Sequence, residues 1–162
     1  MRVRIEGEKV ILRSVESSDI DTILLWENSS AEPLYGVFEE HYTRDDVARF
    51  VAQQQLYPIE LTEQMRLMIC TPDGVRIGAI DLSNYDGTSA DVSILIAEPQ
   101  NRGRGYGKEA LSQLIGYAPT LAIRHLKAII EPNNTASIRL FSSCGFVACR
   151  EREFILQLGV CE

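Results

Sequence analysis

The sequence is poor in the residues that bind metals or form disulfide frameworks. Its 162 residues include four cysteines, none of them in a C-x-x-C pair, and two histidines. A structural zinc site needs four cysteine or histidine ligands, usually in close pairs, so no metal centre is expected. A chain of this length also buries enough surface to fold without disulfide bonds. We therefore predict free, buried thiols in a reducing compartment at Cys70, Cys144, Cys149 and Cys161.

Long apolar runs and an excess of positive charge are absent as well. No segment approaches the ~20 apolar residues of a membrane span, and residues 1–13 lack the apolar core of a signal peptide, which predicts a cytoplasmic protein with no membrane partner. The net charge of −7 disfavours nucleic acid as a partner and mildly favours cationic ones. Because no repeat, low-complexity tract or linker interrupts the sequence, we expect one domain over residues 1–162.

Strand and helix patterns alternate in the N-terminal part of the sequence. Residues 9–15 are rich in β-branched side chains and predict a strand. Residues 17–30 place apolar side chains at helical spacing after Ser17 or Ser18, either of which suits a helix N-cap. Thr43 is the expected N-cap of a second helix, whose first turn carries two aspartates.

The segment between these helices, residues 30–42, has no clean hydrophobic period and contains a proline and a glycine. It carries four ring-bearing side chains and two adjacent glutamates, which suits a loop that covers a binding site. The candidate substrate-binding residues in it are Tyr35, Phe38 and Glu39, and directly after them come Glu40, His41 and Tyr42.

Three strands are expected in the middle of the sequence. Residues 65–71 and 75–85 flank the turn at residues 72–74 and predict a hairpin, and residues 89–99 predict the next strand. Strands joined by such short connections pair antiparallel.

The C-terminal part predicts a crossover unit. After the strand at residues 89–99, the sequence predicts a helix at residues 108–118, a strand at 126–131 and a second helix at 134–144. A strand, helix, strand connection makes its two strands parallel, so the sheet should be mixed. We predict an α+β fold, an α/β three-layer arrangement with a central sheet of about six to seven strands and about four helices.

A glycine-rich stretch lies between the strand and the helix of this unit. Glycines there let the backbone approach an anion, and the unpaired N–H groups of a first helical turn bind phosphate oxygens. The spacing of Gly103, Gly105 and Gly107 fits neither the P-loop nor the dinucleotide fingerprint. From spacing alone, a glycine turn that serves only helix packing stays open as the alternative.

Residues 99–107 read P-x-x-R-G-R-G-Y-G, and residues 134–146 begin with N-x-x-S and end with GF. These two motifs resemble those of the GNAT superfamily of N-acetyltransferases. The earlier one resembles the acetyl-CoA-binding motif Q/R-x-x-G-x-G/A, with Arg102 first. Residues 134–146 resemble the later N-x-x-S…GF segment. The N-terminal half is similar to the branch that contains ribosomal-protein N-terminal acetyltransferases and spermidine acetyltransferases. The resemblance therefore covers nearly the whole sequence and implies a GNAT fold.

The resemblance also implies a cofactor site. It assigns acetyl-CoA as the cofactor, with its pantetheine arm beside residues 94–97, where two parallel strands splay apart. A backbone amide near Leu95 or Ile96 would polarise the thioester carbonyl. Asn134 matches a cofactor-contacting asparagine, although a helix N-cap is an equally ordinary role for it. The pyrophosphate would lie on the backbone amides of Arg102, Gly103, Arg104, Gly105, Tyr106 and Gly107.

The chemistry implied by the resemblance is direct transfer of an acetyl group to a neutral amine. Asp81 and Asp91 lie on neighbouring predicted strands, where similar enzymes carry acidic residues. An aspartate with an ordinary pKa is a poor base for an ammonium, so these residues would bind the cation or order a water molecule that relays the proton. The alternative is that both are merely solvated carboxylates.

A general acid for the leaving thiolate is where the sequence departs from many family members. They have a tyrosine four residues before the glycine of GF, and here Phe141 has no proton to give. Ser137 matches a serine of the ribosomal-protein branch and is the alternative donor, unless its hydroxyl only bonds to helix backbone.

The sequence leaves several assignments open. Residues 147–158 predict either a hairpin or one strand, so the substrate cleft is either more open than in this branch or completed by a partner in a homodimer. The expected activity is N-acetylation of a small polyamine-like amine or a protein N-terminus. A catalytically weak acyl-CoA sensor and an interaction module with the same fold are the alternatives.

Overall fold

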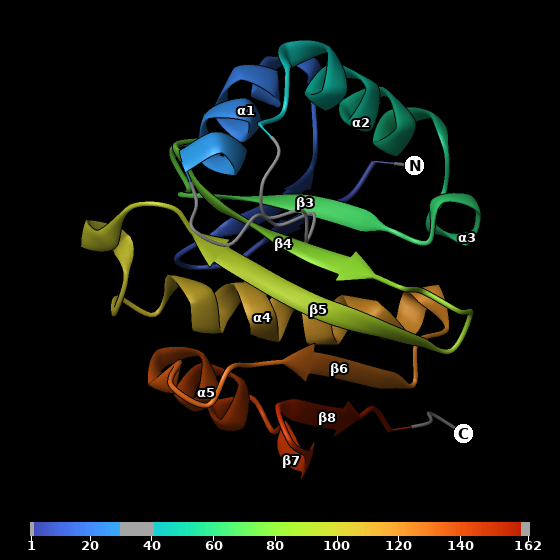
Figure 1. Ribbon diagram of the computed structural model, residues 1–162, viewed down its shortest axis with the longest axis vertical. Coiled ribbons are helices and arrows are strands. Elements are labelled where there is room, and N and C mark those ends of the chain that lie inside the picture. Colours follow the sequence, from blue (N-terminus) through green and yellow to red (C-terminus); the bar gives the residue numbers. More distant parts are fainter. Residues whose placement is uncertain (1, 30–40, 160–162) are drawn as a thin grey trace.

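The computed structural model describes residues 2–29 and 41–159, and its strands form one mixed sheet with helices on both faces (Figure 1). The eight strands of the described residues lie in the order β1-β2-β3-β4-β5-β6-β8-β7. They are β1 (Arg4–Glu6), β2 (Ile11–Ser14), β3 (Met65–Cys70), β4 (Arg76–Ser83), β5 (Ser89–Ile96), β6 (His125–Ile129), β7 (Val147–Arg150) and β8 (Glu153–Gln157). The helices are α1 (Ile20–Ser29), α2 (Arg44–Leu56), α3 (Ile59–Thr62), α4 (Tyr106–Tyr117) and α5 (Thr135–Ser143).

This architecture confirms the predicted α+β class. It has more strands and helices than predicted, and the additional ones are short. The three-residue strand β1 and the one-turn helix α3 are too short to leave a periodic signal in the sequence. Residues 147–158, which the sequence left open, form the hairpin of β7 and β8. All neighbouring strands pair antiparallel except β5 and β6, which are parallel as the crossover predicts.

Alternating side chains along the strands divide the core between the two faces of the sheet. Leu67 on β3 packs in the cluster that includes Leu111 and Leu114 of α4. Met68, the next residue, packs on the opposite face in the cluster that includes Val47 of α2 and Trp26 of α1. Figure 1 shows α4 behind β5 and shows α1 and α2 together at the top of the molecule. The period of two along β3 thus produces the three layers.

The two N-terminal helices begin for different reasons. At α2 the predicted cap is confirmed, because the Thr43 hydroxyl accepts from the Asp46 N–H at 3.2 Å and the Asp46 carboxylate accepts from the Thr43 N–H at 2.8 Å. The predicted serine cap of α1 is wrong. A 3₁₀ turn at Ser17–Asp19 precedes this helix, and the buried Asp19 carboxylate accepts from the Glu16 N–H at 2.8 Å.

The expectations about thiols, metals and membranes have separate outcomes. Cys70 is a free, buried thiol as predicted, whereas Cys149 on the edge strand β7 is exposed, and the prediction of burial is wrong there. Among the described residues, no group of three or more His, Cys, Asp or Glu side chains is arranged to hold a metal ion. None of the helices in the described ranges is long and apolar enough to cross a membrane.

Candidate active site

The parallel strands β5 and β6 stay together for only a short distance. Their register pairs are Ser89 with His125, Ala90 with Leu126 and Asp91 with Lys127. Beyond Asp91, β5 continues to Ile96 with β4 as its only partner among the described strands, while β6 continues to Ile129 alongside β8. One edge of β5 therefore has backbone donors and acceptors that no strand of the described chain uses.

The pairing on either side of β5 identifies which peptide groups face this open edge. The Thr88 carbonyl accepts bonds from the N-terminal end of β6, and the Ala97 N–H donates to the Ile77 carbonyl on the β4 side at 2.9 Å. Because backbone groups alternate in direction along a strand, the peptide groups of even-numbered residues face the gap. This alternation favours Ile96 over Leu95 as the amide that could bind an acyl oxygen.

The loop after β5 presents further backbone amides beside this edge. Gly103 and Gly105 have φ angles of 73° and 86°, a left-handed conformation that glycine adopts without strain, and Gly105 is the N-cap of the 12-residue helix α4. Within the described residues, the N–H groups of Gly103 through Gly107 donate to no protein acceptor. Free amides at the start of a long helix can bind an anion, which is the role predicted for the amides of Arg102 to Gly107. The Arg102 N–H does not fit that prediction, because it donates to the Pro99 carbonyl at 3.1 Å.

The side chains of this loop have distinct contacts. Arg102 donates from Nε to the Ile96 carbonyl at 3.1 Å and thereby links the loop to the open end of β5. Arg104 is exposed, whereas the Tyr106 ring is half-buried against the main hydrophobic core. Any contact of Tyr106 with an anion would therefore use its backbone. Lys9, from the turn between β1 and β2, donates from Nζ to the Arg104 carbonyl at 2.9 Å.

The start of α5 holds the second predicted motif. Asn134 is the N-cap, and its Oδ1 accepts from the Ser137 N–H at 3.1 Å. The structural role that the sequence allowed for Asn134 is thus confirmed. Within the described ranges, no protein group bonds to Asn134 Nδ2 or to the Ser137 hydroxyl, so both remain available to a ligand.

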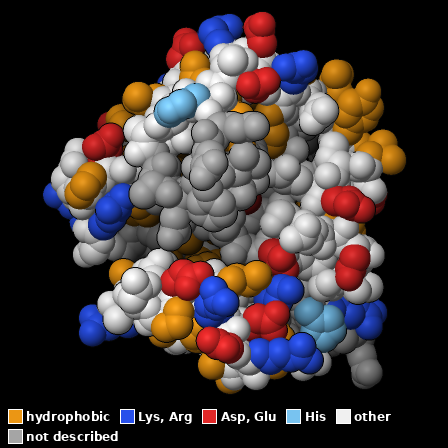
Figure 2. Space-filling model, viewed as in Figure 1, with side chains coloured by type: hydrophobic (Ala, Val, Ile, Leu, Met, Phe, Trp, Pro, Cys, Tyr) orange, Lys and Arg blue, Asp and Glu red, His pale blue; other side chains and the backbone are white. Residues whose placement is uncertain are grey.

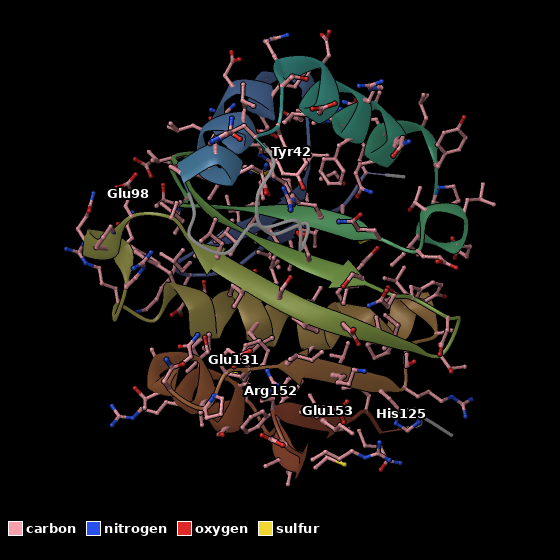
Figure 3. All side chains as sticks on the ribbon, viewed as in Figure 1. Tyr42, Glu98, His125, Glu131, Arg152 and Glu153 are labelled. Atoms are coloured by element: carbon pink, nitrogen blue, oxygen red, sulfur yellow. The ribbon has the colours of Figure 1, made fainter. Side chains whose placement is uncertain are left out.

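Charged side chains gather on the sheet surface where β5 and β6 part. Asp91, whose side chain is 21% exposed, accepts from Asn84 Nδ2 at 2.9 Å and lies 3.7 Å from Lys127 Nζ. Lys127 also lies 4.0 Å from a carboxylate oxygen of Glu153 on β8, labelled in Figure 3. Figure 2 shows acidic and basic side chains mixed over this lower part of the molecule. The point where β5 and β6 separate therefore carries the carboxylates of Asp91 and Glu153 and the ammonium of Lys127.

Asp81 has a different environment from the one predicted for it. Its side chain is 2% exposed, and its two oxygens accept from Nε and Nη2 of Arg66, each at 2.8 Å. Arg66 is equally buried and also contacts Glu27, at 3.4 Å, and the ring of Phe50. The expectation that Asp81 receives an acceptor amine is therefore wrong, as is the alternative of a solvated carboxylate. Burial keeps this carboxylate away from solvent, and the bidentate pair with Arg66 already balances its charge.

Residues 9–147 match the family model of the acetyltransferase (GNAT) domain. The chain belongs to this family. Its members use acetyl-CoA as the acetyl donor. The open edge of β5 and the free amides before α4 are therefore the candidate parts of an acetyltransferase site.

Individual relatives differ in what they acetylate. The L-methionine sulfoximine/L-methionine sulfone acetyltransferase of Salmonella typhimurium is 32% identical over 123 residues, which cover 73% of this chain and 66% of that protein. The alpha/beta-tubulin-N-acetyltransferase 9 of Drosophila melanogaster is 40% identical over 68 residues, or 40% of this chain and 34% of that protein. The chain spans about a third of the length of the first curated relatives it matches.

The fold also matches solved structures. Spermidine N-acetyltransferase from Vibrio cholerae, in complex with CoA and spermine, superposes with a TM-score of 0.75 at 19% identity and covers 93% of this chain and 96% of that one. At this level of identity the match shows the fold, and it confirms the predicted GNAT arrangement.

The candidate site brings most of the predicted cofactor residues close together and adds residues that the sequence did not indicate. Lys9 reaches it from the turn between β1 and β2 and Glu153 from β8, both outside the two motifs, and no local signal in the sequence marks them. Phe141 is buried edge-on against Phe146, with ring centroids 5.0 Å apart, which is a packing role. The substrate candidates Tyr35, Phe38 and Glu39, with Glu40 beside them, lie outside the described residues.

Proposed function

We propose that this acetyltransferase moves the acetyl group of acetyl-CoA directly to an amine at the gap between β5 and β6. The observation that carries the proposal is the unpaired edge of β5 beside the free amides of Gly103 to Gly107. The amides fit a pyrophosphate, and the unpaired edge fits the amide groups of a pantetheine arm. Asn134 Nδ2 is a further donor available to this ligand.

Acetyl-CoA supplies a thioester that is already activated toward an amine. The Ile96 N–H is the protein group that we assign to its carbonyl oxygen, because alternation along β5 directs this N–H into the gap. A preorganised donor that binds an oxyanion contributes about 10²–10³ in rate. It does so because its dipole is already oriented before charge develops.

The amine has to lose a proton, and Asp91 is placed to assist. An ammonium of pKa near 10.4 costs roughly 4–5 kcal/mol to deprotonate at pH 7, at about 1.4 kcal/mol per unit. Asp91 is partly exposed and Lys127 contacts only one of its oxygens, so the carboxylate can bind a cationic acceptor or order a water molecule. We therefore assign Asp91 to binding the acceptor, without a role as the terminal base.

We assign the Ser137 hydroxyl to donating its proton to the leaving thiolate, and the proton that the amine loses, relayed through water, restores the hydroxyl. This hydroxyl has no protein partner among the described residues, although the Ser137 N–H is held by the Asn134 cap. The free hydroxyl is what the acid role needs, and Phe141 provides no competing donor. For the acceptor, we propose a cationic small amine, which the net charge of −7 favours, or a peptide N-terminus, which the resemblance to the ribosomal-protein branch favours.

The experiment combines binding and turnover. Binding of acetyl-CoA is measured by calorimetry, and thiol release is measured with spermidine, spermine, aminoglycosides, amino acids, methionine sulfoximine and peptides with free N-termini. Ser137→Ala should lower kcat by about 10²-fold or more if the serine is the general acid. Ser142→Ala, at an exposed position of the same helix, is the matched control and should leave kcat unchanged.

Three outcomes separate the alternatives. Turnover of one amine class, lost in Ser137→Ala and reduced through KM in Asp91→Asn, supports the proposal. Binding of acetyl-CoA without transfer to any amine supports the acyl-CoA sensor instead. Absence of acetyl-CoA binding refutes the assignment of the loop. The predicted homodimer is tested in the same preparation by sedimentation velocity.

A further inference from the structure

The turn between β1 and β2 is fastened to the beginning of α4. One carboxylate oxygen of Glu109 accepts from the backbone N–H of Lys9 at 2.7 Å and from that of Val10 at 2.6 Å. One helical turn further on, Gln113 donates from Nε2 to the Val10 carbonyl at 3.3 Å. Three hydrogen bonds therefore join two segments that lie about a hundred residues apart in the sequence.

Gly7 shows how closely this turn approaches the helix. A Cβ added to Gly7 would lie 2.0 Å from Nε2 of Gln113 and 2.9 Å from a carboxylate oxygen of Glu109. The turn thus rests directly on the α4 side chains, with no room for a larger residue. Its position relative to α4 is fixed, and this fixes where the Lys9 side chain begins.

From this position Lys9 reaches the glycine-rich loop. Its Nζ donates to the Arg104 carbonyl at 2.9 Å and lies 3.2 Å from where a Cβ of Gly105 would be. In a trans peptide, the carbonyl of one residue and the N–H of the next point in opposite directions. Holding the Arg104 carbonyl toward Lys9 therefore directs the Gly105 N–H away from it, to the side where the amide has no protein partner.

We propose that Lys9 is a positioning residue for the pyrophosphate site. Its ammonium holds the Arg104–Gly105 peptide in the orientation that presents the Gly105 amide to a phosphate oxygen, and Glu109 holds the turn that carries Lys9. The loop backbone requires a contact of this kind to stay in one conformation, because two of its residues are glycines, which otherwise sample many backbone conformations. This inference rests on the proposed function, since it concerns how the same site binds CoA.

The test compares a ligand that contains the pyrophosphate with one that lacks it. Affinity for CoA is measured by calorimetry, and affinity for pantetheine by NMR titration, in the wild type, Lys9→Met and Lys9→Arg. We expect Lys9→Met to weaken CoA binding about 5- to 10-fold, the size of a lost charge-assisted hydrogen bond at an exposed site. Pantetheine binding should change less than about twofold, and Lys9→Arg, which keeps a cationic donor, should restore CoA binding.

Arg4→Met is the matched control, because Arg4 lies in the same hairpin and its side chain bonds only to the exposed Glu6. It removes one positive charge and should leave CoA binding unchanged. Equal losses of CoA affinity in Lys9→Met and Arg4→Met would show that the effect comes from net charge alone, and this would overturn the proposal. So would equal losses for CoA and pantetheine, or no loss at all. A wild type that fails to bind CoA refutes the proposed function before Lys9 is considered.

Discussion

Replacing Asp81 by asparagine separates a structural role from a catalytic one. The substitution keeps the shape of the side chain and removes the charge that faces Arg66, whose guanidinium is almost fully buried. If Asp81 serves the fold, the protein loses stability and the folded fraction keeps its kcat. If Asp81 serves the reaction, kcat falls while stability stays close to that of the wild type.

The structure sets the size of the expected loss. Removing one partner of a buried ion pair costs about 3–5 kcal/mol, because the remaining charge stays buried without compensation. Glu27 still faces Arg66 at 3.4 Å and retains part of the compensation, so we expect the lower end, about 3 kcal/mol. For a chain of this size, about 2–4 °C per kcal/mol converts this to a fall in Tm of roughly 6–12 °C.

Urea unfolding followed by tryptophan fluorescence measures this loss directly. Trp26 is the single tryptophan of the sequence and is buried on the same face of the sheet as Asp81. Asp91→Asn makes the same chemical change on the adjacent strand at a partly exposed site, so it should cost less than about 1 kcal/mol. An Asp81→Asn protein with unchanged stability and lost turnover would refute the reasoning.

Three more predictions follow from buried or exposed groups. Gly78→Ala should destabilise the protein and weaken CoA binding, because its Cβ would lie 1.9 Å from the Leu95 carbonyl oxygen, and urea titration with calorimetry measures both. Burial raises the pKa of Asp19, but hydrogen bonds from two arginines lower it more, to below 3.8. This carboxylate therefore stabilises the fold above that pH and loses its effect as the pH falls through the folded-state pKa. The Tm difference between Asp19→Asn and wild type should accordingly be largest near neutral pH and shrink below about pH 4. Burial raises the pKa of the Cys70 thiol, so Ellman's reagent should reach it only after unfolding, whereas Cys149→Ser should remove one fast-reacting equivalent.

Local patterns predicted much of the fold correctly. The Thr43 cap, the hairpin around residues 72–74 and the crossover through α4 each depend on residues close together in the sequence. The glycine-rich loop also depends on residues close together in the sequence, because a strand, a glycine turn and a helix follow one another directly. The structure places each of these elements where periodicity and turn chemistry indicated.

The errors and omissions concern partners from distant segments. The alternation along β4 cannot show that the inward-facing Asp81 meets Arg66, because their pairing depends on the register between two strands. The cap by Asp19 is an exception, because its carboxylate accepts from the Glu16 N–H only three residues away, although Arg76 on β4 also helps to hold it. Lys9 and Glu153 join the site only through tertiary contacts. Residue type and spacing carry no information about such contacts in a single sequence.

The short join between β5 and β6 has a consequence for folding. Strands β6, β8 and β7 connect to the rest of the sheet through three register pairs, and core packing, including that of α4 against α5, adds to this connection. A ligand that filled the gap as proposed would add backbone hydrogen bonds along the edge of β5 that no described strand uses. Ligation favours the folded state by RT ln(1 + [L]/Kd), about 2.7 kcal/mol at a hundredfold excess over Kd. The supply of ligand in the cell would thus set how cooperatively the two parts of the sheet hold together.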